Sequence, residues 1–287
     1  MTTMTAPHLA KARAFHALHG NGSVLALANA WDVASARLVE QAGGTAVATT
    51  SAGVAWSLGA ADGDRLARDR VLDLIARVVA AVDVPVTADI ESGFGVDVAG
   101  VAETIRGVLA AGAVGVNVED AGNRADTPLR PVDEQAARIA AARAVADNAG
   151  IPLFVNARID TYLRQVGERS DRISITVERA TAYLAAGANG IFVPGVVDPA
   201  TISELVAGIA APLNILAGPG APSVVELAAI GVARVSLGSG IAQAAYGVVH
   251  RATRELLSTG GYTELADALD YGDVNALLAH DTNDTNE

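Results

Sequence analysis

The chain has 287 residues and a formal net charge of −12, and 51% of its residues are hydrophobic. This supplies enough apolar material for a large core, and single α/β barrels reach about 250 residues. The negative charge disfavours nucleic acids and anionic membrane surfaces as partners. No apolar run approaches the roughly 20 residues of a membrane span, and no apolar signal core follows the N-terminus. We therefore expect a cytoplasmic protein.

The residue types that are missing restrict the chemistry further. With no cysteine there is no thiolate nucleophile, no disulfide and no cysteine zinc site. The single lysine, Lys11, precedes the first expected strand, which disfavours Schiff-base chemistry inside a barrel. The five histidines lie near the two ends of the chain. Charged chemistry in its middle must therefore come from aspartate, glutamate and arginine.

Strands and helices alternate along the sequence. After a helix over residues 6–19, apolar runs predict eight strands separated by helices, at residues 24–28, 45–50, 84–89, 114–119, 152–157, 190–194, 212–217 and 233–237. Helix start signals stand at Asp97, Asp133 and the Asp198-Pro199 pair. Eight such units favour a closed parallel (β/α)8 TIM barrel over an open sheet.

An internal repeat supports the barrel. Glycine-containing junctions precede the even strands, most clearly Ala111-Gly112-Ala113 and Ala186-Gly187-Ala188. Proline-containing junctions precede odd strands, at Pro85, Pro152 and Pro212. Odd and even strands alternate in the layers of a barrel interior, so this register indicates more than isolated helix caps.

The C-terminal part extends beyond the eighth unit. We expect residues 1–280 to form one barrel domain with a further helical stretch at about 262–279, and the polar run 281–287 to be disordered. An extra helix beyond a complete barrel favours packing on a partner subunit, so we expect a homo-oligomer, either a dimer or a tetramer.

The most informative stretch ends the third expected strand. Asp89 and Glu91 are two residues apart, so both carboxylates would face the same space. Two like charges at a strand mouth are costly unless a cation or a shared proton lies between them. The alternative is a solvated acidic loop in which Asp97 caps the next helix.

Other strand ends add to the same mouth of the barrel, where barrel enzymes carry their active sites. Thr50, Ser51 and Ala52 are small residues whose backbone amides suit an anion. The other strand ends and their loops add the carboxylates of Asp62, Glu119 and Asp120, the guanidinium of Arg158 and the amide of Asn214. Oxygen ligands without histidine or cysteine favour Mg²⁺, or alternatively Mn²⁺, acting as a Lewis acid. Arg158 offers a fork for a substrate carboxylate or phosphonate. Helix capping explains one or two of the acidic residues, but explains five around one arginine poorly.

Four motifs, in this order, resemble the isocitrate lyase/phosphoenolpyruvate mutase superfamily. They are Ser-Leu-Gly-x-x-Asp at 57–62, Ala-Asp-Ile-Glu-Ser-Gly-Phe-Gly at 88–95, Val-Glu-Asp at 118–120 and Asn-Ala-Arg-Ile-Asp at 156–160. The similarity spans roughly residues 20–250. It implies a Mg²⁺-dependent barrel whose C-terminal helix swaps between subunits, usually in a tetramer. Members make or break a C–C or P–C bond beside an α-keto or enolate oxyanion held on the metal.

The resemblance also implies roles for individual residues. Asp89 looks like the main metal ligand, and Arg158 resembles the arginine that contacts substrate. Residues that would hold metal-bound waters are Asp62, Glu91 and Glu119. The amides near Thr50, Ser51 and Ala52 resemble the loop that binds the substrate carboxylate, and Asn214 resembles an asparagine that family lyases use on substrate.

The lid after the fourth strand departs from the family's lyases. Their Lys-Lys-Cys-Gly-His or Lys-Arg-Cys-Gly-His segment carries an acid/base cysteine, whereas residues 119–130 are shorter and contain no cysteine, lysine or histidine. The lysine-asparagine lid of phosphoenolpyruvate mutase is absent as well. An authentic isocitrate or methylisocitrate lyase is therefore not expected, and the proton donor is not identified. Asn123, Arg124 and Arg130 are candidates for closure over the substrate.

These features predict a Mg²⁺-dependent lyase acting on a small 2-hydroxy or 2-oxo acid, by retro-aldol cleavage to a metal-stabilised enolate. Its catalytic candidates are Arg158, Asp62, Glu119, Asn123 and Arg130. The alternative enzyme is one of P–C chemistry, like phosphoenolpyruvate mutase, phosphonopyruvate hydrolase or carboxyphosphonate phosphorylmutase. A third hypothesis is a non-catalytic binder of keto acids. A glycosidase using two carboxylates is a distant fourth, because few aromatic residues are available to stack on sugars.

Overall fold

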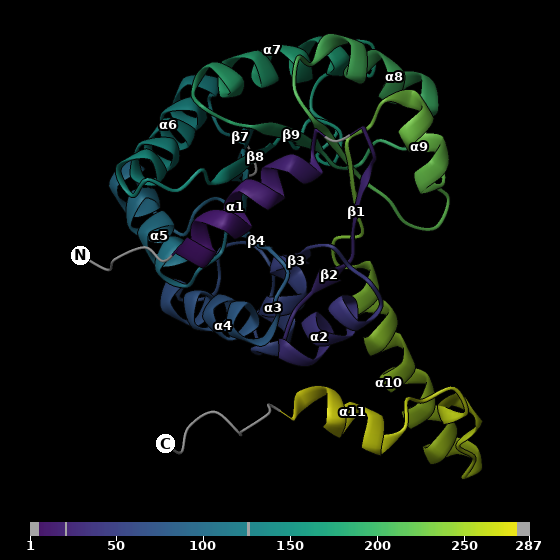
Figure 1. The fold of residues 1–287 in the computed structure, drawn as a ribbon. Coiled ribbons are helices and arrows are strands. Elements are labelled where there is room, and N and C mark those ends of the chain that lie inside the picture. Colours follow the sequence, from purple (N-terminus) through teal and green to yellow (C-terminus); the bar gives the residue numbers. More distant parts are fainter. Residues whose placement is uncertain (1–5, 21, 125–126, 280–287) are drawn as a thin grey trace, which may run out of the picture.

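The protein folds into a parallel β-barrel ringed by helices (Figure 1). The computed structural model describes residues 6–20, 22–124 and 127–279. Nine strand segments form one sheet in the order β1-β11-β10-β9-β8-β5-β4-β3-β2. Since β1 and β2 are separated by one residue, the two ends of this order meet and the barrel is nearly closed.

The barrel strands agree with the sequence prediction. Their bounds are β1 Leu25–Leu27, β2 Asn29–Ala30, β3 Val47–Thr49, β4 Val86–Asp89, β5 Gly115–Glu119, β8 Phe154–Arg158, β9 Gly190–Val193, β10 Leu213–Leu216 and β11 Arg234–Ser236. All eight predicted strands are confirmed to within two residues, with the first one divided into β1 and β2. Each pair of neighbours in the barrel runs parallel, so the carboxyl ends meet at one mouth.

Helices cover the outer face of the barrel (Figure 1). Their bounds are α2 Val33–Gln41, α3 Ser51–Ser57, α4 Arg68–Ala81, α5 Val98–Ala110, α6 Val132–Asn148, α7 Arg172–Ala185, α8 Pro199–Gly208 and α9 Val224–Ile230. Asp97 and Asp198 are N-caps, as predicted, and accept from the amides of Gly100 and Thr201. The start signal at Asp133 marks the beginning of α6, but Asp133 lies in the first turn and the N-cap is Pro131.

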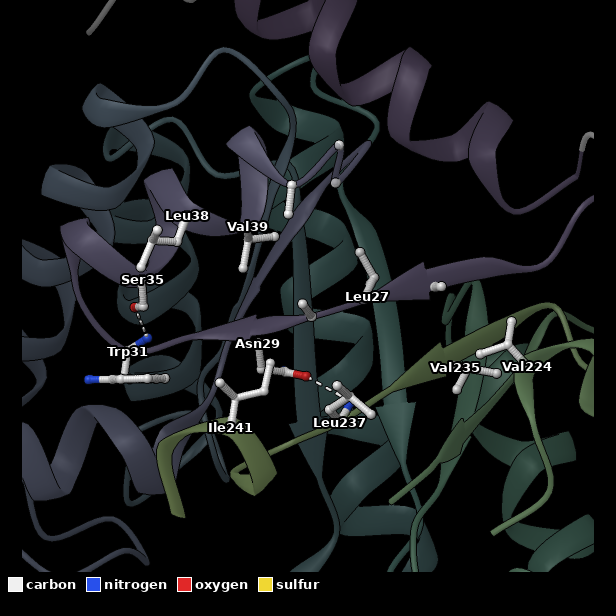
Figure 2. Close-up of a pocket in the computed structure, with 15 residues that line it drawn as sticks. Leu27, Asn29, Trp31, Ser35, Leu38, Val39, Val224, Val235, Leu237 and Ile241 are labelled. Atoms are coloured by element: carbon white, nitrogen blue, oxygen red, sulfur yellow. Dashed lines mark hydrogen bonds between the residues drawn. The ribbon is translucent and has the colours of Figure 1, made fainter. Parts of the chain in front are cut away.

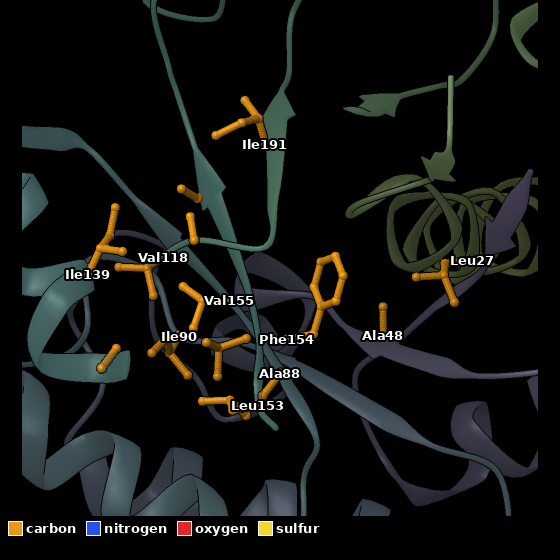
Figure 3. Close-up of a cluster of buried hydrophobic side chains, with 14 of the residues drawn as sticks. Leu27, Ala48, Ala88, Ile90, Val118, Ile139, Leu153, Phe154, Val155 and Ile191 are labelled. Atoms are coloured by element: carbon orange, nitrogen blue, oxygen red, sulfur yellow. The ribbon is translucent and has the colours of Figure 1, made fainter. Parts of the chain in front are cut away.

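Apolar side chains on the outward face of the strands pack against this ring (Figure 3). Ile90, Val118 and Val155 are fully buried beside Ile139 of α6. Burying one such side chain stabilises the fold by roughly 1.5–3 kcal/mol. The inward face is thereby left to polar residues near the mouth.

Helix α1 (Ala6–Leu18) lies across one opening of the barrel (Figure 1), which confirms the predicted N-terminal helix. His19 stacks on Phe154 with ring centroids 3.8 Å apart, and Phe15 meets Phe154 edge-on. The Nε2 atom of His8 lies 3.1 Å from the carbonyl of Ala113, just before β5 begins. These aromatic contacts therefore close the end of the barrel opposite the mouth.

Beyond β11 the chain leaves the barrel (Figure 1). Helix α10 (Gly240–Thr259) projects outward, and the predicted single stretch 262–279 is divided into a 3-10 turn, η1 (Thr263–Leu265), and α11 (Tyr271–Leu278). Helix α11 returns to α2, where Arg37 Nε donates to the carbonyl of Leu277 at 3.0 Å. The predicted tail 281–287 lies outside the described residues. Within those that are described, no helix is long and apolar enough to cross a bilayer.

Candidate active site

The carboxylates at the end of β4 are held in place from the neighbouring strand. The Asp89 amide donates to Thr49 Oγ1 at 2.9 Å. Asp89 Oδ1 accepts from the Glu91 amide at 3.2 Å, and its Oδ2 from the Ser51 amide at 3.5 Å. Glu91 has a left-handed φ of 51° and is 3% exposed. The turn after Asp89 therefore folds back on itself, and both carboxylates lie at the carboxyl end of β4.

A second loop closes over these carboxylates. The amide of Asp64 donates to Glu91 Oε2, which brings the loop between α3 and α4 to the end of β4. Burial is the main cause of the raised pKa of Asp89, Glu91 and Glu119, and the negative charge of Asp62, an exposed residue on the same loop, adds a small contribution to each. Asp62 thus lies within electrostatic range of the other three residues that the sequence assigned to the metal, and their role as metal ligands stays a prediction.

Arg158, at the end of β8, faces this cluster. Its Nη1 lies 2.8 Å from Glu119 Oε2, and its Nε lies 2.6 Å from Asp160 Oδ1. A second bond, from Nη2 to Asp160 Oδ2 at 3.0 Å, completes a two-pronged contact. Although burial opposes the charge, the two carboxylates outweigh it and raise the pKa of Arg158. Arg158 is therefore a fixed cation beside the carboxylates.

Asp120 does not belong to the mouth, contrary to the sequence prediction. It is completely buried on the other side of the strand end. Its Oδ1 accepts from the Asp160 amide at 2.9 Å, and its Oδ2 accepts from Arg179 at 3.0 Å and Tyr183 at 2.9 Å. Alternation along a strand explains the error, because Asp120 follows Glu119 directly and points the opposite way. Asp120 instead supports the segment that carries Asp160.

A positioning residue that the sequence did not reveal is Arg138 of α6. Its guanidinium is 2% exposed and donates to the carbonyls of Ser92, Gly95 and Val96 at 3.3, 3.0 and 2.7 Å. These carbonyls belong to the loop that follows Glu91. No motif marks Arg138, because its partners lie more than 40 residues away. It fixes the loop behind the carboxylates.

The predicted carboxylate-binding residues lie at the start of a helix rather than in a loop. Thr50 is the N-cap of α3, and Ser51 and Ala52 form its first turn. First-turn amides lack partners within their own helix and suit an anion. The Thr50 amide is already bonded to the carbonyl of Ala30 at 3.0 Å. Binding of a substrate carboxylate by this turn stays a prediction.

Asn214 lies deeper in the barrel than a substrate contact at the mouth would need. It is 1% exposed, donates to Ser236 Oγ at 3.1 Å and accepts from Asn156 at 3.2 Å. Its contact with substrate stays a prediction.

The short lid is a two-stranded hairpin, which the sequence did not predict. It consists of β6 (Ala121–Arg124) and β7 (Thr127–Leu129). The side chains of Asn123 and Arg124 lie outside the described residues. Arg130 sits at the base of the hairpin, where its amide donates to the Asp120 carbonyl at 2.7 Å and its Nη1 to Glu134 at 2.7 Å. The catalytic roles of these lid residues stay predictions.

The cluster is electrostatically unbalanced and suits a cation. Burial raises the pKa of Asp89, raises that of Glu91 to about 7 and raises that of Glu119 to about 8. Among the described residues no three carboxylate or histidine side chains converge closely enough to ligate one ion. Mg²⁺ commonly takes only one or two protein carboxylates and keeps several waters. The oxygen-only donor set therefore fits Mg²⁺ held by one direct ligand and by waters.

Comparison with known proteins decides the family. The family model of phosphoenolpyruvate phosphomutase matches residues 15–257. The chain belongs to the isocitrate lyase/phosphoenolpyruvate mutase superfamily. An uncharacterized protein of Mycobacterium tuberculosis is 40% identical over 78% of this chain and 81% of its own length. The 2-methylisocitrate lyase of Escherichia coli is 29% identical over 70% of this chain and 68% of its own length.

Solved structures of the superfamily share the fold. A Burkholderia cenocepacia protein, provisionally assigned as a lyase or mutase, has a TM-score of 0.90 at 40% identity, covering 96% of this chain and 98% of that one. A phosphonopyruvate hydrolase in complex with oxalate and Mg²⁺ has a TM-score of 0.81 at 26% identity, covering 93% and 94%. The protein is thus an enzyme of a superfamily of lyases and phosphomutases that cleave or form C–C or P–C bonds.

The raised pKa values make the stability of this superfamily member depend on pH. Glutamate in an unfolded chain has a pKa of about 4.3, so Glu91 and Glu119 bind more protons in the folded state. The free energy of unfolding of the metal-free protein is therefore expected to fall as the pH rises from about 5 to about 8. Since Mg²⁺ requires ionised ligands, any stabilisation by added Mg²⁺ is expected to grow over the same range.

Thermal unfolding at pH 6 and at pH 8.5, with chelator and with Mg²⁺, measures both trends. A metal-free midpoint that is unchanged or higher at pH 8.5 would contradict the assignment of these two buried carboxyls.

Proposed function

We propose that the protein is a Mg²⁺-dependent lyase that cleaves or forms a C–C bond next to the carboxylate of a small 2-hydroxy or 2-oxo acid. The observation that carries this proposal is the mouth formed by Asp89, Glu91 and Glu119 with Arg158 fixed beside them. Its relationship to 2-methylisocitrate lyases supports the reaction class. Mn²⁺ is the alternative ion, and we propose a cytoplasmic location.

Each group in the mouth has a task in this proposal. Asp89 would hold Mg²⁺ directly, and Asp62, Glu91 and Glu119 would hold it through waters. The ion supplies a Lewis acid for an oxygen beside the substrate carboxylate. Arg158, held by Glu119 and Asp160, keeps a positive charge in a fixed position against the substrate. The first turn of α3, at Thr50, Ser51 and Ala52, would bind the carboxylate.

The second candidate is P–C bond chemistry. The lid leaves it open, since residues 119–130 contain no cysteine to serve as the acid of the family's lyase reaction. The likeness to phosphonopyruvate hydrolase supports it. Arg158 suits a phosphonate as well as a carboxylate.

Turnover assays separate the two candidates. The purified enzyme with Mg²⁺ is offered 2-methylisocitrate, other small 2-hydroxy acids, oxaloacetate and phosphonopyruvate. Cleavage of a hydroxy or oxo acid supports the lyase, and release of phosphate from phosphonopyruvate supports the second candidate. Tight oxalate binding without any turnover would instead support a non-catalytic keto-acid binder.

We further propose that a second copy of the chain completes the barrel wall. In a (β/α)8 barrel the helix after each strand packs back on the sheet, but α10 leaves the barrel after β11. A pocket of ≈540 Å³ lies at this position (Figure 2). Its mainly apolar lining includes Ala26, Leu27, Val39, Val235, Leu237 and Ile241. Helix α10 in turn exposes Val249, Leu256 and Leu257. The α10 helix of a partner subunit would cover the pocket in a dimer or tetramer.

Light scattering after size exclusion tests this assembly. The wild type is expected to have at least twice the mass of one chain. Leu257 of α10 is 80% exposed, and Leu257→Asp is expected to shift the enzyme to a smaller species. Val96→Asp, at a fully exposed apolar position away from α10, should leave the mass unchanged. A monomeric wild type, or a Leu257→Asp variant of unchanged mass, would contradict this interface.

A further inference from the structure

A buried arginine inside the barrel has no carboxylate partner. Arg234 begins β11, is 1% exposed and is among the largest fully buried side chains. Its Nη2 lies 3.4 Å from Asn117 Oδ1. Among the described residues no acidic group lies within ion-pair distance of it, and its Nε and Nη1 have no hydrogen-bond partner. A buried charge normally persists only where another charge offsets it.

Arg234 belongs to a polar layer in the barrel interior. Asn156 donates to Asn117 at 2.9 Å and to Asn214 at 3.2 Å, and Asn214 donates to Ser236 at 3.1 Å. Register places this layer against the carboxylates. Asn117 pairs with Asp89 across β4 and β5, and Glu119 is the next inward residue on β5.

The nearest source of compensating charge is therefore the mouth of the barrel. Asp89 is the acidic residue whose charge acts on the Arg234 guanidinium. Burial lowers the pKa of Arg234 to about 9, so the side chain still carries its proton near neutral pH. A fixed positive charge at this depth opposes a cation at the carboxylates and attracts an anion.

We propose that Arg234 is a charge-setting residue that makes the site favour Mg²⁺ together with an anionic ligand over Mg²⁺ alone. The proposal rests on the proposed function, since it concerns the same mouth. Arg234 lowers the affinity for the free ion and raises the affinity for the doubly negative acid that arrives with it. The two ligands then bind more tightly together than the affinity of either alone would suggest.

Two binding measurements on the intact enzyme test this proposal. Calorimetric titration gives the affinity for Mg²⁺ alone and the affinity for oxalate at saturating Mg²⁺. Arg234→Met removes the charge and keeps an apolar side chain of similar length, which buried sites commonly tolerate. We expect Mg²⁺ to bind several-fold more tightly to this variant and oxalate to bind about tenfold more weakly.

Two further variants separate charge from packing. Arg234→Lys keeps the charge and is expected to restore both affinities to near the wild-type values. Arg143→Met alters a part-buried arginine at the opposite end of the barrel, where it donates to the carbonyls of Gly187 and Leu153 at 3.1 and 2.6 Å. This variant should change neither affinity.

The signs of the two changes decide the outcome. If Arg234 has only a structural role, Arg234→Met should bind both Mg²⁺ and oxalate more weakly than the wild type. That result, or no change in either affinity, would overturn the proposal. Failure of the proposed function is distinguishable, because the wild type would then bind no oxalate with Mg²⁺. In that case the Mg²⁺ titration of Arg234→Met still tests the charge effect.

Discussion

Replacing Asp89 with asparagine is expected to abolish Mg²⁺-dependent turnover, with a loss on the order of 10³-fold or more. The isosteric amide removes the negative charge but keeps the size of the side chain. The hydrogen bond from the Asp89 amide to Thr49 at 2.9 Å is independent of the side chain and is retained, so the fold should persist. Steady-state kinetics against Mg²⁺ concentration measure the loss.

The matched control is Asp133→Asn, which alters an exposed carboxylate in the first turn of α6. It should turn over at the wild-type rate with the wild-type Mg²⁺ dependence. An Asp89→Asn enzyme that keeps its response to Mg²⁺ would show that the ion binds elsewhere.

Arg158→Met is expected to destabilise the fold as well as to end catalysis. Without the guanidinium, the carboxylates of Glu119 and Asp160 lose contacts at 2.8 and 2.6 Å in a largely buried setting. Breaking a buried pair by removing one partner commonly costs about 3–5 kcal/mol, because the other charge is left without compensation. Urea unfolding at pH 8 measures the loss in the free energy of unfolding.

A surface ion pair supplies the comparison. Arg77 lies 2.9 Å from Asp73 with both side chains more than half exposed. Arg77→Met should change the free energy of unfolding by less than about 1 kcal/mol. If Arg158→Met unfolds at the same urea concentration as the wild type, the contacts of Arg158 do not stabilise the barrel.

The barrel was predictable because its signals are local. Each strand is an apolar run bounded by turn residues, and the register of glycine and proline junctions repeats along the chain. The carboxylate pair Asp89 and Glu91 was visible for the same reason, since the two residues are two positions apart at one strand end. Such local patterns can be read without knowing which distant segments of the chain come into contact.

The unpredicted features depend on partners that are distant in sequence. Arg138 bonds to carbonyls more than 40 residues away, and Arg234 reaches Asn117 across the barrel. Nothing in the sequence around either arginine distinguishes it from a surface residue of a helix or strand. The misplacement of Asp120 has a different origin, because strict alternation after Glu119 already points it away from the mouth.

The most direct test of the proposed metal site is thermal unfolding of the intact enzyme with oxalate, a mimic of the enolate of a 2-oxo acid, with and without Mg²⁺. A ligand that binds only the folded state at a hundredfold excess over its dissociation constant stabilises it by about 2.7 kcal/mol. We predict a large upward shift of the midpoint that needs both components and disappears in Asp89→Asn. The absence of any shift with either Mg²⁺ or Mn²⁺ would contradict the site, leaving a barrel that shares the superfamily's fold without its chemistry.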